Sequence, residues 1–347
     1  MTSPDRVTVI APARLHLGFV DLNPPAGRRF GSLGLALEAP HTAVRAQRSA
    51  NESGAVHSQE KAARYLQALR RAHAIPDDVS VHIDAQIPEH CGLGSGTQLA
   101  LAVGTAVSRL LDLNLMPLDI RQILARGTRS GVGIGAFAQG GFLLDGGHGA
   151  STSLPPITCR IAFPEHWRVL LIFDEASQGL SGAKEVDAFR TLPTFPETLS
   201  AHLCRLVMTR VLPGLAEASM AEFGPAITEV QRIVGDHFAP AQGGRFASSR
   251  VADVLAWLEG RGVQCVGQSS WGPTGFAMLE SQTQAEEFVR EAETRWHEQN
   301  LRFVIARGRN APASVQVQDS ENRDATIIPF LPLPGEVQVV AGEMLAN

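Results

Sequence analysis

Pro88-Glu-His-Cys-Gly-Leu-Gly-Ser-Gly-Thr-Gln98 is a glycine-rich stretch between two different hydrophobic periodicities. Apolar residues alternate with polar ones over 79–87, which predicts a half-buried strand, and they recur at helical spacing from about 97 to 111. Three glycines allow a sharp turn that exposes consecutive N–H groups, and the following helix directs its positive dipole end to the same place. The stretch therefore predicts a phosphate-binding loop, in which the Ser95 and Thr97 hydroxyls add donors or help to hold a metal.

The alternative for this stretch is a tight glycine turn with Thr97 as an ordinary helix cap. Two well-known phosphate loops are excluded. No Gly-Lys-Ser/Thr follows as in a P-loop, and the glycine spacing differs from the dinucleotide-binding fingerprint. Phosphate or pyrophosphate remains the ligand class that suits the loop.

Outward from the loop, the chain predicts two α+β halves. Short strands are expected at 7–11 and 34–37, and an amphipathic helix at 59–74. The second half opens with a strand at 167–173 and ends in a helix–strand–strand–helix–strand order over 247–306, which resembles a split βαβ sandwich. We place the boundary near residue 155, giving domains 1–155 and 156–347. The pattern does not tell which domain takes residues 312–347, where a further short strand is expected at 337–342. Asp119 is expected to cap a helix.

The composition bounds the function classes. The 347 residues carry a net charge of -5, which argues against a nucleic-acid partner or a basic membrane-surface protein. The four cysteines are scattered, so neither a disulfide framework nor a zinc site is expected. There is no cleavage signal and no apolar run long enough to cross a bilayer, so we expect a cytoplasmic protein with no membrane partner.

Three segments together resemble the GHMP kinase superfamily of galactokinase, homoserine kinase and mevalonate kinase. The loop at 88–98 is similar to its P-x-x-x-G-L-G-S-S motif, Ala11–Phe19 (APARLHLGF) to its first motif, and Gly267–Gly275 (GQSSWGPTG) to its third. The resemblance implies a two-domain α+β fold. Its N-terminal α/β domain would be of the ribosomal-S5-domain-2 type, its C-terminal domain a ferredoxin-like α+β sandwich, and its site would lie in the cleft between them.

One departure from the kinases bears on the chemistry. Mevalonate-type kinases carry an S-G-V-D segment whose Asp is the catalytic base, whereas Ser130-Gly-Val-Gly here places Gly133 at that position. Gly96 also replaces the second Ser of the loop. A glycine cannot accept a hydroxyl proton. The phosphate cradle is therefore expected without the kinase base, although homoserine kinases lack this Asp as well, so kinase activity stays open.

A narrower resemblance covers four segments in order: CGLGSGTQ, SGVGIGAF with GGFLLDGGH, GLSGAKEVDAF and GQSSWGPTGF. Together they are similar to the β-ribofuranosylaminobenzene 5′-phosphate synthase family of tetrahydromethanopterin biosynthesis. That family couples phosphoribosyl pyrophosphate to 4-aminobenzoate or 4-hydroxybenzoate through a carbon–carbon bond and releases CO2 and pyrophosphate. The resemblance implies Mg2+ as cofactor, these two small-molecule substrates, and a homodimer. The residues do not choose between the amino and the hydroxy substrate.

Candidate site residues lie in or beside these segments, and the anionic substrates favour arginine forks and backbone amides. We expect substrate and phosphate binding from Arg14, Gly92, Leu93, Gly94, Ser95, Gly96, Thr97, Gln98, Arg129, Ser130, Gln268, Ser269, Ser270 and Trp271. The candidates for catalysis are His16, Asp21, Lys184 and Glu185, and those for metal binding are Ser95, Asp145 and Asp174. Three functions remain open: the decarboxylating transferase, a small-molecule kinase, and a non-catalytic binder of a phosphometabolite.

Overall fold

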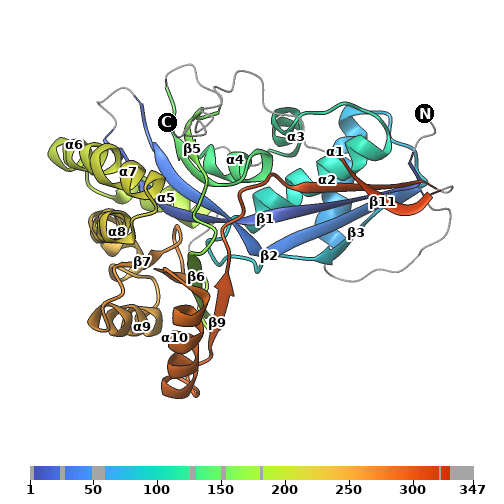
Figure 1. The fold of residues 1–347 in the computed structure, drawn as a ribbon. Helices are drawn as coiled ribbons and strands as arrows, with labels where there is room; N and C mark the ends of the chain where they lie inside the picture. The colour runs from blue at the N-terminus through green and yellow to red at the C-terminus, as the bar shows by residue number, and fades with distance from the viewer. Residues whose placement is uncertain are drawn as a thin grey trace, which may run out of the picture.

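The structure, a computed structural model, describes residues 4–23, 28–48, 59–125, 130–149, 154–179, 183–319 and 322–328. Two β-sheets organise the chain, and the long antiparallel pair β1 (Arg6–Phe19) and β2 (Ser32–Arg48) extends from one region to the other (Figure 1). Along β1, every second side chain from Val7 to Leu17 is fully buried. That alternation is why this segment forms a strand with one face against the core.

The first sheet has the order β11-β10-β1-β2-β4-β5, with β3 also paired to β2. Its other strands are β3 (Val79–Ala85), β4 (Phe142–Asp145), β5 (Ile157–Ile161), β10 (Ser314–Asp319) and β11 (Asn322–Ile328). The helices of this half are α1 (Gln59–Ala72), α2 (Ser95–Leu110), α3 (Pro117–Leu124) and α4 (Val132–Ala138). The buried side of α2 packs against β1 and β2, so the start of this helix is fixed relative to the first strand.

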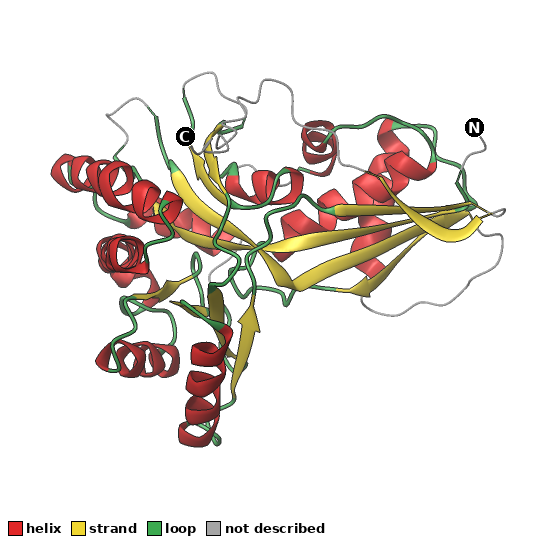
Figure 2. Cartoon of the chain, viewed as in Figure 1, coloured by secondary structure: helices red, strands yellow, loops and turns green. Residues whose placement is uncertain are grey.

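The second sheet is antiparallel with the order β7-β8-β6-β9, which is the strand order of a ferredoxin-like sandwich. Its strands are β6 (Arg168–Asp174), β7 (Cys265–Gln268), β8 (Gly275–Leu279) and β9 (Leu301–Ala306). Helices α9 (Ser249–Gly260) and α10 (Gln282–Arg295) pack against it through the cluster that includes Leu170 and Ile172. Figure 2 places these helices on one side of the sheet.

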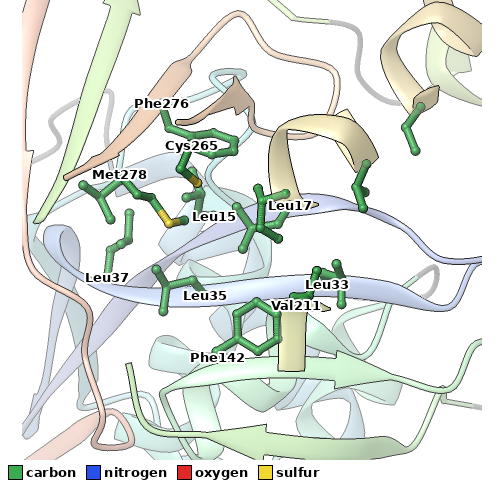
Figure 3. Close-up of a cluster of buried hydrophobic side chains, with 14 of the residues drawn as sticks. Leu15, Leu17, Leu33, Leu35, Leu37, Phe142, Val211, Cys265, Phe276 and Met278 are labelled. Carbon is green, nitrogen blue, oxygen red and sulfur yellow. The ribbon is translucent and has the colours of Figure 1, made fainter. Parts of the chain in front are cut away.

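A second helical group covers the end of the β1–β2 pair in Figure 1. It comprises α5 (Ala183–Thr191), α6 (Glu197–Leu206), a π-helical segment η2 (Val207–Val211), α7 (Leu212–Ala216) and α8 (Met220–Gln242). One apolar cluster joins the two sheets: Leu15 and Leu35 of the first lie with Phe276 and Met278 of the second (Figure 3). This shared core fixes the two halves around β1.

The fold class expected from the sequence is confirmed, and α2 and β3 lie where the helix and strand beside the glycine-rich loop were expected. The short strands expected at 7–11 and 34–37 are instead parts of the longer β1 and β2, so the first motif lies within β1. The expected division at residue 155 does not coincide with the sheets, since β5 and residues 314–328 pair within the first sheet. The strand expected at 337–342 lies outside the described residues. Asp119 is not a helix cap: it is the third residue of α3, and its carboxylate accepts the N–H of Met116. In the described ranges, we find no helix both apolar and long enough for a bilayer.

Candidate active site

A cavity of about 490 Å³ lies where the glycine-rich loop, β1, α1 and α5 meet. One part of its lining, the loop end, is formed by Gly92, Gly94 and residues 95–97 at the start of α2, and aromatic side chains form another part, the aromatic end. Ser270, Trp271 and Gly272, from the loop between β7 and β8, complete the wall. The predicted phosphate loop and the third glycine-rich motif therefore border one cavity.

The loop turns through glycines that no other residue could replace without strain. Gly94 precedes α2 with φ 77° and Gly92 has φ 83°. A Cβ on Gly92 would lie 2.2 Å from the Ser269 carbonyl oxygen. The carbonyl of Gly94 accepts the N–H groups of Thr97 and Gln98, and no side chain caps the helix. The alternative of Thr97 as an ordinary cap is therefore wrong, and the first N–H groups of α2 are directed toward the cavity end as an anion site requires.

Arg14 brings a half-buried positive charge to this loop. Its backbone N–H donates to Leu93 O at 3.1 Å, and its Nη1 donates to Gly92 O at 3.3 Å. Its Nε is buried and has no hydrogen-bond partner among the described residues. Burial lowers the pKa of Arg14 to about 10, against the opposing effect of the negative charges of Glu185 and Asp145. The guanidinium remains charged at neutral pH, and its incomplete pairing favours an anion from solution.

His16 follows two residues later and is held as a neutral imidazole. Its backbone N–H donates to Ser269 Oγ at 3.0 Å, and its Nδ1 accepts the N–H of Gly18 at 3.3 Å. Burial, together with the charge of Arg14, lowers the pKa of His16 well below its ordinary value. A neutral ring that accepts at Nδ1 carries its proton on Nε2, so His16 is a hydrogen-bond donor at that atom.

Aromatic side chains form the end of the cavity beyond His16. Phe19 lies 4.7 Å from the His16 ring, Phe30 lies 5.3 Å from Phe189, and Phe189 lies 5.4 Å from Trp271, all measured between ring centroids. All four aromatic residues line the cavity. Trp271 was expected from the sequence, whereas Phe19, Phe30 and Phe189 were not named as site residues. Phe19 is the last residue of the first motif, and this position was the one sequence signal that could have identified any of the three as a site residue.

Helix α1 supplies a further side of the loop end that the sequence reasoning missed. The ammonium of Lys61 pairs with the carboxylate of Glu89, which also accepts from Gln86 Nε2 at 2.7 Å. The hydrogen bond from Lys61 is the main reason that the pKa of Glu89 is lowered. Tyr65, the single tyrosine of the chain, donates to Gly96 O at 3.5 Å. Lys61 is one of two lysines in the sequence, and this rarity was the signal that could have identified it.

Family matches and relatives agree on the class of protein. The family described as GHMP kinases N terminal domain matches residues 59–141, and GHMP kinases C terminal matches residues 211–298. Beta-ribofuranosylphenol 5'-phosphate synthase of Archaeoglobus fulgidus is 31% identical over 325 residues, covering 88% of this chain and 98% of that protein. The chain belongs to this synthase family, within the GHMP kinase superfamily. The synthase of Methanothermobacter thermautotrophicus is 28% identical, covering 78% of this chain and 87% of that protein.

Solved structures of the superfamily share the fold of this family member. Homoserine kinase from Cytophaga hutchinsonii superposes with a TM-score of 0.61 at 17% identity, covering 91% of this chain and 98% of that one. Mevalonate diphosphate decarboxylase from Staphylococcus aureus gives 0.60 at 13% identity, covering 90% of this chain and 98% of that one. At these identities the likeness establishes the two-domain architecture alone.

In this synthase-family chain, three residues that were expected to bind phosphate form hydrogen bonds with other parts of the protein. Ser269 is fully buried, donates to Gly92 O at 2.7 Å and accepts the N–H of His16, so it joins β1 to the loop. Gln268 accepts the Ala247 N–H at 2.6 Å, and Gln98 donates to Gly133 O at 2.7 Å. None of the three lines the cavity at the loop. Their geometry supports positioning roles and does not test ligand binding.

The two aspartates proposed as metal ligands are saturated by donors from the protein. Asp145 is buried and accepts from Ser32 (N–H and hydroxyl), the Ser130 hydroxyl, and the N–H groups of Gly131 and Gly147. These bonds fix the start of α4 to β2 and β4. Because five donors occupy its two oxygens, this geometry favours a structural role for Asp145 over the expected role as a metal ligand.

Asp174, at the end of β6, is in the same situation. It accepts from the Ser177 and Ser248 hydroxyls, from Arg250 and from the Ala176 N–H. Burial opposes ionisation, but these hydrogen bonds and the Arg250 charge outweigh it and lower the pKa of Asp174. It does not line the cavity, and this position also favours a structural role over metal binding. No group of three or more potential ligands among His, Cys, Asp and Glu occurs in the part of the chain that the structure describes.

The remaining candidates divide between the cavity and its surroundings. Glu185 of α5 and Ser130 line the cavity. Asp21 lies outside its lining and accepts from the Asn23 N–H and the Ser200 hydroxyl, both at 2.7 Å. Arg129 and the side chain of Lys184 lie outside the described residues. Gly133 lines the cavity, and a Cβ there would make an ordinary 3.5 Å contact with Thr97, so this position has room for a side chain.

Proposed function

We propose that this chain is a decarboxylating phosphoribosyltransferase of tetrahydromethanopterin biosynthesis. It joins phosphoribosyl pyrophosphate to 4-hydroxybenzoate or 4-aminobenzoate and gives a β-ribofuranosyl-benzene 5′-phosphate, CO2 and pyrophosphate. The observation that carries the proposal is one cavity lined by two chemically different groups of residues, an amide-rich loop beside Arg14 and four aromatic side chains. A highly charged sugar phosphate suits the first group and a planar benzoate suits the second.

The loop end stabilises the departing pyrophosphate. Breaking the bond between the ribose anomeric carbon and oxygen leaves its electron pair on pyrophosphate and an oxocarbenium-like sugar. The N–H groups at the start of α2, the Ser95 hydroxyl and the Arg14 guanidinium are positioned to compensate the negative charge that develops. Lys61, at the edge of the same end, adds a second cation.

The carbon–carbon bond then forms without a protein base. The benzoate ring carbon that bears the carboxylate attacks the anomeric carbon, and the para substituent donates electron density to that carbon. The bond to the carboxylate breaks next, CO2 departs, and its electron pair restores the aromatic ring. No proton has to be removed by the enzyme, so Gly133 in the place of the kinase aspartate is compatible with this reaction.

Mg2+ remains part of the proposal through the substrate. A hydroxyl ligand is available from Ser95, which lines the cavity, whereas Asp145 and Asp174 have their oxygens occupied. Mg2+ commonly binds through substrate phosphates with one or two protein ligands, which fits this donor set. When bound, the ion would neutralise charge on the pyrophosphate leaving group. A homodimer in the cytoplasm completes the expectation, and sedimentation of the purified protein tests the dimer.

A labelled-carboxyl assay tests the reaction. The protein is incubated with phosphoribosyl pyrophosphate, Mg2+ and each carboxyl-labelled benzoate, and release of labelled CO2 and of pyrophosphate is followed in equal amounts. Parallel reactions contain ATP with homoserine or mevalonate. Labelled CO2 that requires phosphoribosyl pyrophosphate supports the proposal. ATP-dependent phosphorylation of a small alcohol would establish the kinase alternative, and binding of phosphoribosyl pyrophosphate without turnover would favour the non-catalytic binder.

A further inference from the structure

Helix α1 brings a second cation to the cavity, one helical turn from a contact with the glycine-rich loop. Lys61 and Tyr65 are four residues apart on α1, so they lie on one side of the helix, about 6 Å apart along its axis. Both line the cavity. Tyr65 is buried in the apolar cluster that joins α1 to α2, and its hydroxyl donates to Gly96 O at 3.5 Å. Because this core fixes α1 against α2, the fold sets the position of Lys61 relative to the loop.

A carboxylate holds the ammonium of Lys61 at the start of the loop stretch. Lys61 pairs with Glu89, which also accepts from Gln86 Nε2 at 2.7 Å, and all three residues line the cavity. The hydrogen bond from Lys61 lowers the pKa of Glu89, so this carboxylate is ionised at neutral pH. The side chains stay 37% and 38% exposed, so cavity water reaches the pair. An ammonium donates three hydrogen bonds, and Glu89 is its one acceptor among the described residues, which leaves two N–H groups for a ligand.

Lys61 and Arg14 approach the loop from different elements and have different charged neighbours. Arg14 contacts the loop from β1 through Gly92 O, whereas α1 contacts it four residues later along the chain. Burial lowers the pKa of Arg14, and the charge that most opposes this lowering is that of Glu185, whereas Lys61 is paired with Glu89. The cavity therefore offers two cations in separate surroundings, which suits a ligand with two anionic groups.

Phosphoribosyl pyrophosphate is a ligand with two such groups. Its pyrophosphate is on C1 of the ribose and its phosphate is on C5, with the ring between them. In the proposed reaction the start of α2 and Arg14 take the pyrophosphate, and Lys61 is the other Lys or Arg side chain in the described lining of the cavity. The benzoate carboxylate does not suit this position, because it is on the reacting carbon and must lie beside C1. A partly exposed ammonium suits a hydrated phosphate, which keeps some of its water on binding.

We propose that Lys61 binds the 5′-phosphate of phosphoribosyl pyrophosphate, at a subsite distinct from the pyrophosphate site at the start of α2. The inference rests on the proposed function and deepens it. With one anion bound at α1 and the other at α2 and Arg14, the ribose is held through both of its substituents while the bond at C1 breaks. The 5′-phosphate stays bound when pyrophosphate departs, so the oxocarbenium-like sugar keeps its position for attack by the benzoate.

Fragments of the donor test the two subsites separately. Ribose 5-phosphate, pyrophosphate and 4-hydroxybenzoate are each titrated calorimetrically in the presence of Mg2+, so that no turnover occurs. Lys61→Gln removes the charge but keeps an N–H donor for Glu89, and Lys61→Arg restores the charge. Arg64→Met removes an exposed charge from the same helix, outside the cavity, and is the matched control. The KM for phosphoribosyl pyrophosphate is measured for each protein in the labelled-CO2 assay.

Lys61→Gln should weaken ribose 5-phosphate binding about tenfold and pyrophosphate binding less than about threefold, as expected for the loss of one partly solvated, charge-assisted hydrogen bond. It should raise the KM for phosphoribosyl pyrophosphate by a similar factor and change kcat little, because the 5′-phosphate is bound alike in the ground state and the transition state. Lys61→Arg should recover most of both losses, and Arg64→Met should change neither by more than about twofold. In the native protein, ribose 5-phosphate should still bind when pyrophosphate is saturating, because the two subsites are distinct.

The assignment is overturned by an equal loss for all three ligands in Lys61→Gln, by a loss confined to pyrophosphate or 4-hydroxybenzoate, or by an unchanged affinity for ribose 5-phosphate. Should Lys61→Gln not fold, the native protein decides: displacement of ribose 5-phosphate by pyrophosphate contradicts distinct subsites, and simultaneous binding supports them. If the native protein binds none of the ligands and releases no CO2, the proposed function fails. If it forms product while Lys61→Gln binds ribose 5-phosphate as the native protein does, only the assignment of Lys61 fails.

Discussion

Replacing Arg14 with methionine should stabilise the ligand-free protein while removing its ability to bind phosphoribosyl pyrophosphate. Arg14 carries a charge that burial disfavours, and its Nε has no partner among the described residues. Methionine keeps much of the buried stem and removes the charge. The substitution therefore separates the cost of the charged group in folding from its value in binding.

The size of the effect follows from the pKa. The lowering of the Arg14 pKa from its ordinary value to about 10 disfavours the charged form in the folded protein by roughly 3 kcal/mol, at about 1.4 kcal/mol for each tenfold change in proton affinity. The penalty is present in full below about pH 10 and disappears as the pH rises toward the ordinary pKa of arginine, so measurements at neutral pH contain all of it. Arg14 is half-buried, so cavity water screens part of this penalty. Losing the hydrogen bond to Gly92 O costs the variant about 1 kcal/mol, so the free energy of unfolding of Arg14→Met should exceed that of the native protein by about 1 kcal/mol.

Urea unfolding followed by tryptophan fluorescence measures the gain, with Arg205→Met on the exposed side of α6 as the matched control. Pyrophosphate at a hundred times its dissociation constant should stabilise the native protein by about 2.7 kcal/mol and should stabilise Arg14→Met much less. A less stable Arg14→Met would mean that the protein already compensates the charge. Equal stabilisation of both proteins by pyrophosphate would place the pyrophosphate away from Arg14.

Three further predictions concern neighbouring residues. Gly92→Ala should destabilise the protein by more than about 2 kcal/mol, because the new Cβ meets the Ser269 carbonyl. Gly94→Val is strained by the φ of 77° but makes only ordinary contacts with Arg14, so it should cost less stability than Gly92→Ala and abolish turnover; chemical denaturation and the CO2 assay distinguish the two. Because the pKa of His16 is lowered by burial, stability should fall as the pH drops below 6.5, where the unfolded imidazole takes up a proton and the folded one does not; His16→Gln should flatten this part of a urea-midpoint profile. Asp145→Asn should cost about 3 kcal/mol of stability by disturbing five hydrogen bonds, and the Mg2+ concentration that supports half of its remaining activity should be unchanged, since a shift would restore Asp145 as a metal ligand.

The loop end of the site could be predicted from the sequence because its chemistry is local. Three glycines, a preceding strand and a following helix are adjacent along the chain. The positive φ values of Gly92 and Gly94 and the position of the loop at the start of α2 agree with that pattern. The aromatic end could not be predicted in this way. Phe30 and Phe189 reach it from the start of β2 and from α5, and each would be counted as ordinary core by its local pattern.

Polar residues in motifs were harder to assign than the motifs themselves. Gln98, Ser269 and Asp145 lie within segments that the sequence identified, yet their side chains point into protein and satisfy buried groups. A local pattern gives the position of a hydroxyl or carboxylate along the chain, but the number of donors around it depends on elements distant in sequence. Long-range pairing also explains why residues 314–328, after the second sheet in sequence, complete the first.

The cavity combines a superfamily scaffold with a change at the position where the kinases carry their base. Gly133 lines the wall beside Thr97, and the 3.5 Å contact that a Cβ would make there means that sterics do not require glycine. Its φ is not in the left-handed region either, since it lies within helix α4. A Cβ is therefore tolerated by the fold at this position, so close packing does not explain the glycine. A transfer in which CO2 leaves as the ring recovers its electrons has no proton for a base at residue 133 to remove, whereas phosphorylation of an alcohol does.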